Sequence, residues 1–557
     1  MLPTNAQYFS ELLSKNQISI YFIIAVLNAA LIFMASFKFL LSIQQSGYKT
    51  RRYFKWLNSR ETPYRSRLML LTLMGFLFSL VLSTCFAPIF GGQISSYVGF
   101  VSYILFTIVY INTEASVNVK IPLKKTKRMV RLSITYVIVL IAITFGLVVL
   151  VNYITFVIGD RMTAILRYSL LCACPVLIPY LLLIAHIINL PIEKAIARYY
   201  VNKAKEKLAK LDVKRIAITG SFGKTTVKEI LTTILSQKYR VLQTPESYNT
   251  PMGIAVTVKG LDSTHDIFLA EMGARAKGDI KTLCKMVKPD FGILTGVNTQ
   301  HLETFATIEN IKNTKYELFD YLEEKGGVGI FSVDNENSKE LSNKFKGEKI
   351  CAGLCGEDAF ATDVKISSIG TEFMLNVKGE EPVLCHTVLL GKHNISNICL
   401  AAAMAKKIGM SAKEISVGIN RIKSIGHRLE LMPNNKNIVI IDDSYNANVD
   451  GVYAAMDVLD TFSGRKIVLT PGLVELGKME DVANLEMGKV LAEHADKVII
   501  IGKHNAVMLI NGLIEGGMPR ENIIFAKNLK KGNQALNEIL KEGDVVLFEN
   551  DLPDNYN

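Results

Sequence analysis

Five long apolar stretches in the first 190 residues constrain the fold more than any other feature of the sequence. They occupy residues 18–41, 68–88, 89–111, 132–158 and 164–190. Each is long enough for a helix to cross the hydrocarbon core of a bilayer, which takes about 20 residues. A backbone in lipid must satisfy its own hydrogen bonds, and a helix of this length does so. The sequence therefore predicts an α-helical transmembrane domain of about five helices over residues 1–191.

Positive charge in the connecting segments predicts the orientation of these helices. Residues 42–67 contain seven Lys and Arg against one Glu, and residues 113–131 contain six against one. The other two connections are short and nearly uncharged. Basic loops are retained on the cytoplasmic side. The N-terminus is therefore expected outside the membrane, and everything after residue 190 in the cytoplasm.

The basic character of the chain belongs to this first part. Residues 1–211 contain 23 Lys and Arg against 6 Asp and Glu, which leaves 40 against 45 in residues 212–557. The high isoelectric point is thus no sign of nucleic-acid binding, and no nucleic-acid partner is expected. Residues 192–211 form a basic helical linker, which either lies along anionic lipid headgroups or is a solvated connector. The eight cysteines are scattered and are expected to be free thiols.

A glycine-bearing turn opens the remaining part of the chain. Residues 217–226 read A-I-T-G-S-F-G-K-T-T, between a predicted strand at 214–218 and a helix that runs to about residue 236. Such a turn surrounds a phosphate with backbone N–H groups at the positive end of a helix. Lys224 would reach the terminal phosphates of a nucleotide, and the Thr225 hydroxyl would bind Mg²⁺. The first glycine of the usual pattern is replaced by Ile218, so a turn without nucleotide is the alternative. The predicted nucleotide contacts are Gly220, Ser221, Phe222, Gly223, Lys224, Thr225 and Thr226.

Polar residues follow the next predicted strands. Residues 244–253 form a polar turn that is either a substrate loop or a surface turn, with Ser247, Tyr248 and Asn249 as candidates. Glu271 ends a buried strand at 266–272, where a Mg²⁺ ligand is expected beside a phosphate loop. His301 follows the strand at 291–297 and is a second candidate ligand.

The rest of the chain predicts a small β region and a second α/β domain. Residues 363–391 alternate like antiparallel strands, and residues 391–397 open a helix in which Asn394 either caps the helix or contacts a base. Strands at 438–441, 466–470, 497–501 and 544–548 alternate with helices, which predicts a mostly parallel sheet. We therefore expect a central domain over 212–427 and a C-terminal domain over 428–557. Helical periodicity leaves Lys315 as an exposed lysine.

Seven of these motifs occur in the order found in one known family. The chain reads A-I-T-G-S-F-G-K-T-T, E-M-G-A, N-T-Q-H-L-E, T-K-Y-E-L, G-K-H-N-I-S-N, G-H-R-L-E and I-D-D-S-Y-N-A-N. Over residues 212–548 it resembles the Mur ligases, most closely the branch that adds D-alanyl-D-alanine to a UDP-muramoyl-tripeptide. The resemblance implies a P-loop ATPase domain, a Rossmann-like C-terminal domain and an ATP-dependent carboxylate–amine ligase. Such enzymes act through an acyl phosphate in bacterial peptidoglycan biosynthesis, and they use ATP and two Mg²⁺ ions.

The resemblance also implies roles for particular residues. Lys224 corresponds to the phosphate lysine, Thr225 and Glu271 to ligands of the first Mg²⁺, and His301 to a ligand of the second. Lys315 occupies the position of a carbamylated lysine that holds the second metal, which replaces its interpretation as an ordinary surface lysine. Further positions correspond to the adenine contact Asn394, the ATP contacts Arg428 and Asp443, and Tyr445 and Asn446 near the acceptor amine.

Departures from the family pattern leave the substrate open. The UDP-binding first domain of the family is replaced by the membrane domain, and the C-terminal V-V-L-F-E-N-D lacks the Lys-Gly-Ser of the D-alanyl-D-alanine-adding branch. The expected partners are a cell-wall precursor, which is UDP-linked or lipid-linked, an amino acid or dipeptide, membrane lipid, and other membrane proteins of envelope biosynthesis. The alternatives are a ligase of another envelope polymer or poly-amino acid, and a non-catalytic ATP-binding membrane protein. The expected location is the bacterial plasma membrane.

Overall fold

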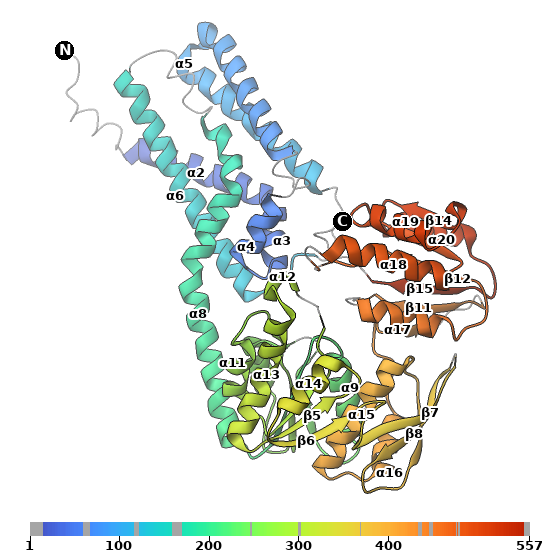
Figure 1. Cartoon of the computed structure of the whole chain (residues 1–557). Helices are drawn as coiled ribbons and strands as arrows, with labels where there is room; N and C mark the ends of the chain where they lie inside the picture. Colours follow the sequence, from blue (N-terminus) through green and yellow to red (C-terminus); the bar gives the residue numbers. More distant parts are fainter. Residues whose placement is uncertain are drawn as a thin grey trace. The chain divides into compact units, whose positions relative to one another are not determined.

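The chain divides into two compact units, Met1–Ile196 and Ala197–Asn557. Figure 1 shows the computed structural model, coloured along the sequence. The structure describes residues 15–58, 67–115, 122–158, 170–245, 248–298, 302–367, 369–432, 437–444, 449–474, 476 and 479–550.

The first unit is helical, as predicted. Its elements are α2 (Lys15–Ala35), α3 (Phe37–Gln45), α4 (Thr50–Leu57), α5 (Met69–Ala115), α6 (Lys127–Ile158), the 3₁₀ segment η2 (Leu170–Leu177) and the start of α8 (Ile178–Lys210). The first predicted membrane helix is shorter than expected, because the helix breaks at Ser36 and α3 begins after it. The Ser36 hydroxyl donates to Ile32 O at 2.7 Å, a bond of a kind that often bends a helix.

Helix α5 contains the second and third predicted membrane helices and turns back on itself. A straight helix would separate Gly75 from Phe106 by about 46 Å, at 1.5 Å per residue. Instead a Cβ placed on Gly75 would lie 3.2 Å from Phe106 Cβ, and the rings of Phe78 and Phe106 are 5.6 Å apart. The two ends of α5 therefore run side by side in opposite directions, as a pair of spans requires (Figure 1).

The predicted division between a last membrane helix ending at residue 190 and a separate helical linker over residues 192–211 is wrong. Helix α8 passes through Pro191 and continues to Lys210, so the basic segment 192–211 is the second half of the same helix. A proline removes one backbone hydrogen bond, and apolar helices tolerate that loss. The second half has its own packing, since Ala204 and Leu208 are buried among residues of the second unit. The first half belongs to the core of the first unit.

Four helices among the described residues are long and apolar enough to cross a membrane. They are Gln17–Ala35, Met69–Ile89, Lys127–Ile154 and Cys174–Lys210, and Phe100–Thr113 is a shorter apolar helix. Large apolar side chains on them are exposed, for example Leu27, Leu105 and Ile138 at 59%, 58% and 60%. Polar side chains pair inside this unit instead: Tyr103 Oη donates to Asn28 Oδ1 at 2.8 Å, and Asn28 Nδ2 donates to Thr144 Oγ1 at 3.3 Å.

The second unit contains two sheets, and the first is mixed. Its nine strands lie in the order β2-β3-β1-β4-β5-β6-β7-β8-β9, parallel as far as β7 and antiparallel beyond it. This confirms the predicted antiparallel region. The strands are β1 (Lys214–Thr219), β2 (Val241–Gln243), β3 (Ile267–Glu271), β4 (Phe291–Leu294), β5 (Val328–Ser332), β6 (Glu348–Ala352), β7 (Ala359–Ser367), β8 (Gly370–Val377) and β9 (Val383–Thr387). The helices are α9 (Lys224–Leu235), α10 (Pro251–Val258), α11 (Asp279–Val287), α12 (Leu302–Phe305), α13 (Ile308–Lys325), α14 (Glu336–Lys344), α15 (Lys392–Ile408) and α16 (Ala412–Ile419).

The second sheet confirms the predicted mostly parallel arrangement. Its order is β10-β11-β15-β12-β13-β14, and only the edge strand β10 runs antiparallel to its neighbour. The strands are β10 (Glu430–Met432), β11 (Val439–Asp443), β12 (Lys466–Thr470), β13 (Lys497–Ile501), β14 (Ile523–Ala526) and β15 (Val545–Glu549). The helices are α17 (Val449–Leu459), α18 (Glu480–His494), α19 (Ala506–Glu515), the 3₁₀ turn η4 (Arg520–Asn522) and α20 (Leu529–Ile539). Strands β10 and β14 were not predicted.

Parallel order brings the ends of successive strands to one edge of each sheet. In the central sheet, β1, β3 and β4 end together at Thr219, Glu271 and Leu294, according to their register. In the second sheet, β11 and β15 end together at Asp443 and Glu549. Ligands of open α/β sheets bind beyond these carboxyl ends.

Candidate active site

The glycine-bearing turn forms a phosphate-sized loop between β1 and α9. Gly220 and Gly223 have φ angles of +153° and +75°, which side chains other than glycine rarely adopt. A Cβ on Gly220 would also lie only 2.1 Å from Thr295 Oγ1. Gly223 is the residue that precedes α9, and no side chain caps that end of the helix. The first N–H groups of α9 are therefore directed toward the loop, as an anion site requires.

The end of β4 holds this loop in place. Ser221 N donates to Gly296 O at 2.7 Å, and the Thr295 hydroxyl donates to Phe222 O. The Phe222 ring covers Gly296 so closely that a Cβ there would lie 2.4 Å from the ring. The conformation of the loop is thus set by contacts from a neighbouring strand as well as by its own glycines.

Lys224 begins α9 and folds back over the loop. Its Nζ donates to Gly220 O at 2.8 Å and to Ser221 O at 2.9 Å. Burial lowers the pKa of Lys224 to about 8, Glu271 opposes this shift, and the positive charge of Arg428 adds to it. A lysine with a lowered pKa that bonds only carbonyls is in position to receive an anion.

Glu271 is the anionic centre of the site. It is 1% exposed, and Oε2 accepts from the Thr225 hydroxyl at 2.9 Å. Its other oxygen, Oε1, accepts from Asn249 Nδ2 at 3.1 Å. The fully buried Lys228 places Nζ 3.5 Å from Oε2. The sequence analysis missed Lys228, although its spacing from Leu231 and Leu235 puts it on the buried stripe of α9.

Lys315 is buried, so its prediction as an exposed lysine is wrong. The residue is 3% exposed and shares the buried stripe of α13 with Ile311, Leu318 and Leu322. That spacing was the signal in the sequence. Burial and the nearby charge of Lys224 together lower the pKa of Lys315 to about 7, against the opposing charges of Asp279, Glu317 and Glu271. Lys315 therefore lies within electrostatic range of both Lys224 and Glu271.

The residues predicted to form a substrate loop lie in different surroundings. Asn249 lies inside the site through its bond to Glu271, whereas Tyr248 is 42% exposed. Thr250 caps α10 by accepting from Gly253 N. Four predicted residues lie outside the described part of the chain, namely Ser247, His301, Tyr445 and Asn446.

The amides at the start of α15 reach different partners. Asn394 is 3% exposed and its Nδ2 donates to Leu390 O at 2.8 Å, one turn earlier. Asn397 lies against the phosphate loop, because a Cβ on Gly223 would be 2.9 Å from Asn397 Oδ1. The structure thus brings Asn397 to the loop.

Arg428 and Asp443 lie close together at the second sheet. Asp443 ends β11, and its Oδ1 accepts from Leu429 N at 3.2 Å. Burial raises the pKa of Asp443 to about 6, although the Arg428 charge opposes this shift. Arg428 also acts on Lys224, as described above, so its charge reaches both groups.

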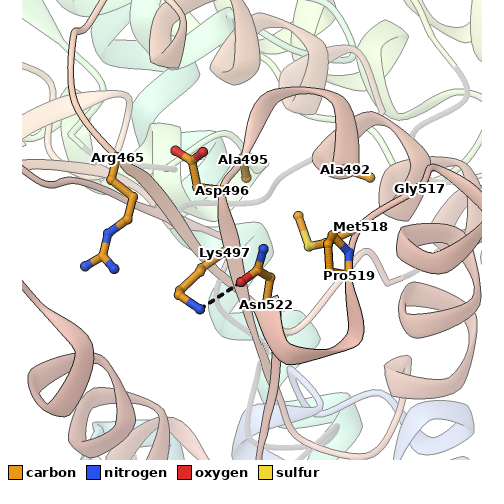
Figure 2. Close-up of a pocket in the computed structure, with 9 residues that line it drawn as sticks. All are labelled: Arg465, Ala492, Ala495, Asp496, Lys497, Gly517, Met518, Pro519 and Asn522. Carbon is orange, nitrogen blue, oxygen red and sulfur yellow. Dashed lines mark hydrogen bonds between the residues drawn. The ribbon is translucent and has the colours of Figure 1, made fainter.

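Figure 2 shows a surface pocket at the opposite edge of the second sheet. It lies beside Arg465, Lys497 and Asn522, which come just before or at the beginning of β12, β13 and β14. Lys497 Nζ donates to Asn522 Oδ1 at 2.9 Å. This is the amino edge of the sheet, away from the edge where ligands of such folds bind. We assign the pocket no role.

The donor set fits a magnesium ion shared with a nucleotide. Among the described residues, no group of three or more His, Cys, Asp and Glu side chains could hold a metal. The Thr225 hydroxyl and the Glu271 carboxylate supply two adjacent oxygen donors beside the phosphate loop. Mg²⁺ is usually bound in this way, by one or two protein oxygens together with phosphates and water.

Comparison with known proteins agrees with this geometry. Residues 218–405 match the Mur ligase middle domain, and residues 427–549 match the Mur ligase glutamate ligase domain. The UDP-N-acetylmuramoyl-tripeptide–D-alanyl-D-alanine ligase of Bacillus subtilis is 30% identical over 352 residues, 62% of this chain and 75% of the relative. The enzyme of the same name from Escherichia coli is 30% identical over 334 residues, 59% of this chain and 73% of the relative.

Solved structures lead to the same family. MurF from Acinetobacter baumannii aligns with a TM-score of 0.58 and 25% identity, over 64% of this chain and 76% of that one. MurF from Thermotoga maritima, solved in complex with ADP, aligns with the same score and identity over 64% and 80%. The chain therefore belongs to the Mur ligase family and is an ATP-dependent ligase that forms carbon–nitrogen bonds.

Proposed function

We propose that this protein is a membrane-embedded ligase that joins a peptidoglycan-precursor carboxylate to the amine of D-alanyl-D-alanine or a similar amino acid or dipeptide. The observation that carries the proposal is that Lys224 and Glu271 meet at one loop from separate elements, with the buried Lys315 of a third element within electrostatic range of both. A protein that only binds ATP has no need of a buried lysine opposite the metal carboxylate. The resemblance to ligases that use a UDP-muramoyl-tripeptide supports the substrate class.

The residues around the loop suit phosphoryl transfer to a carboxylate. The N–H groups at the start of α9 and the Lys224 ammonium bind the β- and γ-phosphates, and they stabilise the charge that develops during transfer. Mg²⁺, held by Thr225 and Glu271, supplies charge neutralisation on the phosphate oxygens when it is bound. Asn249 and Lys228 keep the Glu271 carboxyl group oriented. Arg428 and Asp443 contribute from the C-terminal domain as ATP contacts, with Asn394 on the adenine side.

Lys315 is suited to become a carbamate. Its lowered pKa leaves a large neutral fraction near pH 7, and only the neutral amine reacts with CO₂. The nitrogen forms a bond to the carbon of CO₂ and releases one proton, so a buried cation is replaced by an anionic oxygen ligand. Together with His301, that carboxylate would hold the second Mg²⁺.

The first unit supports a membrane-linked substrate. Four apolar helices with exposed Leu, Ile and Phe side chains match a lipid environment better than water. One such helix is enough to anchor a protein, so the additional helices call for a further role. The basic segments beside them favour the binding of an anionic headgroup such as a polyprenyl diphosphate.

The test uses the purified full-length protein in detergent, with ATP, Mg²⁺ and D-alanyl-D-alanine. Phosphate release and product mass are followed with a UDP-linked muramoyl-tripeptide and with the same peptide on a polyprenyl diphosphate. Ligation of either peptide supports the enzymatic assignment, and faster use of the lipid-linked form supports the membrane role. ATP binding without phosphate release on either peptide would contradict the enzymatic assignment. Equal use of both carriers would reduce the membrane unit to an anchor.

A further inference from the structure

We infer that Lys228 is the counter-ion of Glu271 in the nucleotide-free enzyme, and that its charge makes the binding of Mg²⁺ at Glu271 depend on a bound nucleotide. The inference rests on the proposed function, because it concerns the magnesium ion assigned there to Thr225 and Glu271. Lys228 is a positioning residue in this account, since it acts through the carboxylate that binds the metal.

Lys228 is buried between two carboxylates. It lies one turn after Lys224 in α9, and its side chain is 0% exposed. Its Nζ lies 3.5 Å from Glu271 Oε2 and 3.4 Å from Glu229 Oε1. The Glu271 side chain is buried as well, so water screens this ion pair much less than it would screen a pair at the surface. Lys228 therefore competes strongly with any cation that approaches Glu271.

Glu229 is held in place by contacts of its own. Gln243 Nε2 donates to Glu229 Oε2 at 2.9 Å, and the Thr232 hydroxyl donates to Gln243 Oε1 at 2.7 Å. Gln243 is the last residue of β2, which pairs with the strand that ends at Glu271. The Glu229 side chain is 37% exposed, so hydration helps to stabilise it as an anion. Lys228 therefore keeps a carboxylate partner when a metal ion binds Glu271.

The charges around Glu271 disfavour a metal ion that arrives alone. The donors on this carboxylate are neutral, namely the Thr225 hydroxyl and the Asn249 amide. Lys224 lies within electrostatic range of the same carboxylate, so Mg²⁺ without nucleotide would meet one carboxylate and two ammonium groups. A triphosphate supplies the negative charge that this site lacks, and Mg²⁺ is commonly bound by one or two carboxylates together with phosphates.

The experiment measures the binding of Mn²⁺, which replaces Mg²⁺ and is visible by electron paramagnetic resonance. The full-length protein in detergent is titrated with Mn²⁺ alone and with Mn²⁺ plus a non-hydrolysable ATP analogue. We expect the analogue to tighten Mn²⁺ binding to the unmodified protein by about 100-fold, within the usual range of coupling between two ligands. Lys228→Gln keeps an N–H donor but has no charge. It should bind Mn²⁺ alone about tenfold more tightly than the unmodified protein, and the coupling should fall to about tenfold.

Lys312→Gln is the matched control. Lys312 is also a buried lysine between two glutamates, since it is 7% exposed and pairs with Glu309 and Glu340. Both variants lose a buried ion pair, so both should have a lower Tm, but only Lys228→Gln should bind Mn²⁺ differently.

Glu229→Gln tests the second partner of Lys228. This variant removes the carboxylate that Lys228 keeps when the metal binds Glu271. Mn²⁺ binding in the presence of the analogue should therefore weaken by about tenfold. Unchanged binding in Glu229→Gln would contradict the inference.

The outcomes separate this inference from the proposed function. Equal Mn²⁺ affinity with and without the analogue in the unmodified protein overturns the inference, whether or not the variants fold. Unchanged or weaker binding of Mn²⁺ alone to Lys228→Gln also overturns it, as does the same tightening in Lys312→Gln. The titrations need no turnover, so the expected binding without ligation leaves the inference standing and contradicts the proposed function. Normal ligation with unchanged metal binding in Lys228→Gln contradicts the inference alone.

Discussion

Two buried glutamates end strands at the ligand-binding edges of the two sheets, and their surroundings are opposite. Glu271 in the central sheet is 1% exposed and receives donors from Thr225 and Asn249, with Lys228 nearby. Glu549 in the second sheet is 0% exposed and has no hydrogen-bond partner in the described structure. A partnered buried carboxylate is prepared to be an anion, whereas an unpartnered one is prepared to change its state when a ligand binds. The difference therefore lies in hydrogen bonding: the central domain holds a buried glutamate with donors around it, and the C-terminal domain holds one without.

Lys224→Ala should have the largest effect, because it removes the cation that folds over the phosphate loop of the central domain. No other lysine described at the loop bonds its carbonyls, so charge on the β- and γ-phosphates would lose its stabiliser during transfer. We expect ligation to fall about 100-fold or more, the usual cost of losing one such group. Phosphate release at saturating ATP measures it. Lys339→Ala, a change on the exposed face of α14, is the control, and near-normal turnover of Lys224→Ala would refute the loop assignment.

Lys315→Ala should be nearly inactive and partly restored by added acetate. The carbamate proposed for Lys315 is an anionic ligand, and a small carboxylate can replace it in the space left by the side chain. Lys315→Arg keeps a positive charge but cannot form the carbamate, so it should stay inactive with or without acetate. Initial rates at rising acetate concentration provide the measurement. Full activity of the arginine variant would mean that Lys315 acts as a cation.

Glu271→Gln and Glu549→Gln should differ in stability. The first change leaves buried Lys228 without its full partner and disturbs two hydrogen bonds, which costs about 2 kcal/mol. That corresponds to a fall in Tm of about 4–8 °C for a domain of this size. The second change replaces a buried carboxyl group that has no hydrogen-bond partner and whose pKa is raised by burial, so the Tm should stay within about 1 °C or rise. Thermal unfolding of the full chain in detergent tests both, and equal losses would contradict the contrast.

The local parts of the site could be predicted from the sequence, because short-range patterns define them. The strand, glycine turn and helix around Lys224 are contiguous, and Glu271 was recognisable as the end of a buried strand. The burial of Lys315 had a sequence signal, its place on a stripe with Ile311 and Leu318, but a charged residue on such a stripe is usually assigned to the surface.

Properties that depend on distant pairing could not be predicted. Glu549 meets Asp443 only because β15, the last strand, inserts between β11 and β12, an order that the sequence does not specify. The continuation of α8 through Pro191 was missed for a related reason, since the packing of Ala204 and Leu208 stabilises its second half. In both cases tertiary contacts outweigh the local pattern.

Asp443→Asn should change stability less than Glu271→Gln, and the effect should depend on pH. The folded pKa of Asp443 is raised to about 6 from an ordinary value of 3.8. The folded state therefore binds its proton more tightly than the unfolded state, and stability from this group is present below pH 4 and is lost as the pH rises to 6. Asparagine cannot ionise, so the variant should match the unmodified protein at pH 4 and exceed it above pH 6. Because Asp443 is only partly buried, we expect a gain of about 1 kcal/mol, discounted for solvent screening. Tm measured on both proteins from pH 4.5 to 8 tests this, and a gain that shrinks as the pH rises would show that the fold stabilises Asp443 as an anion.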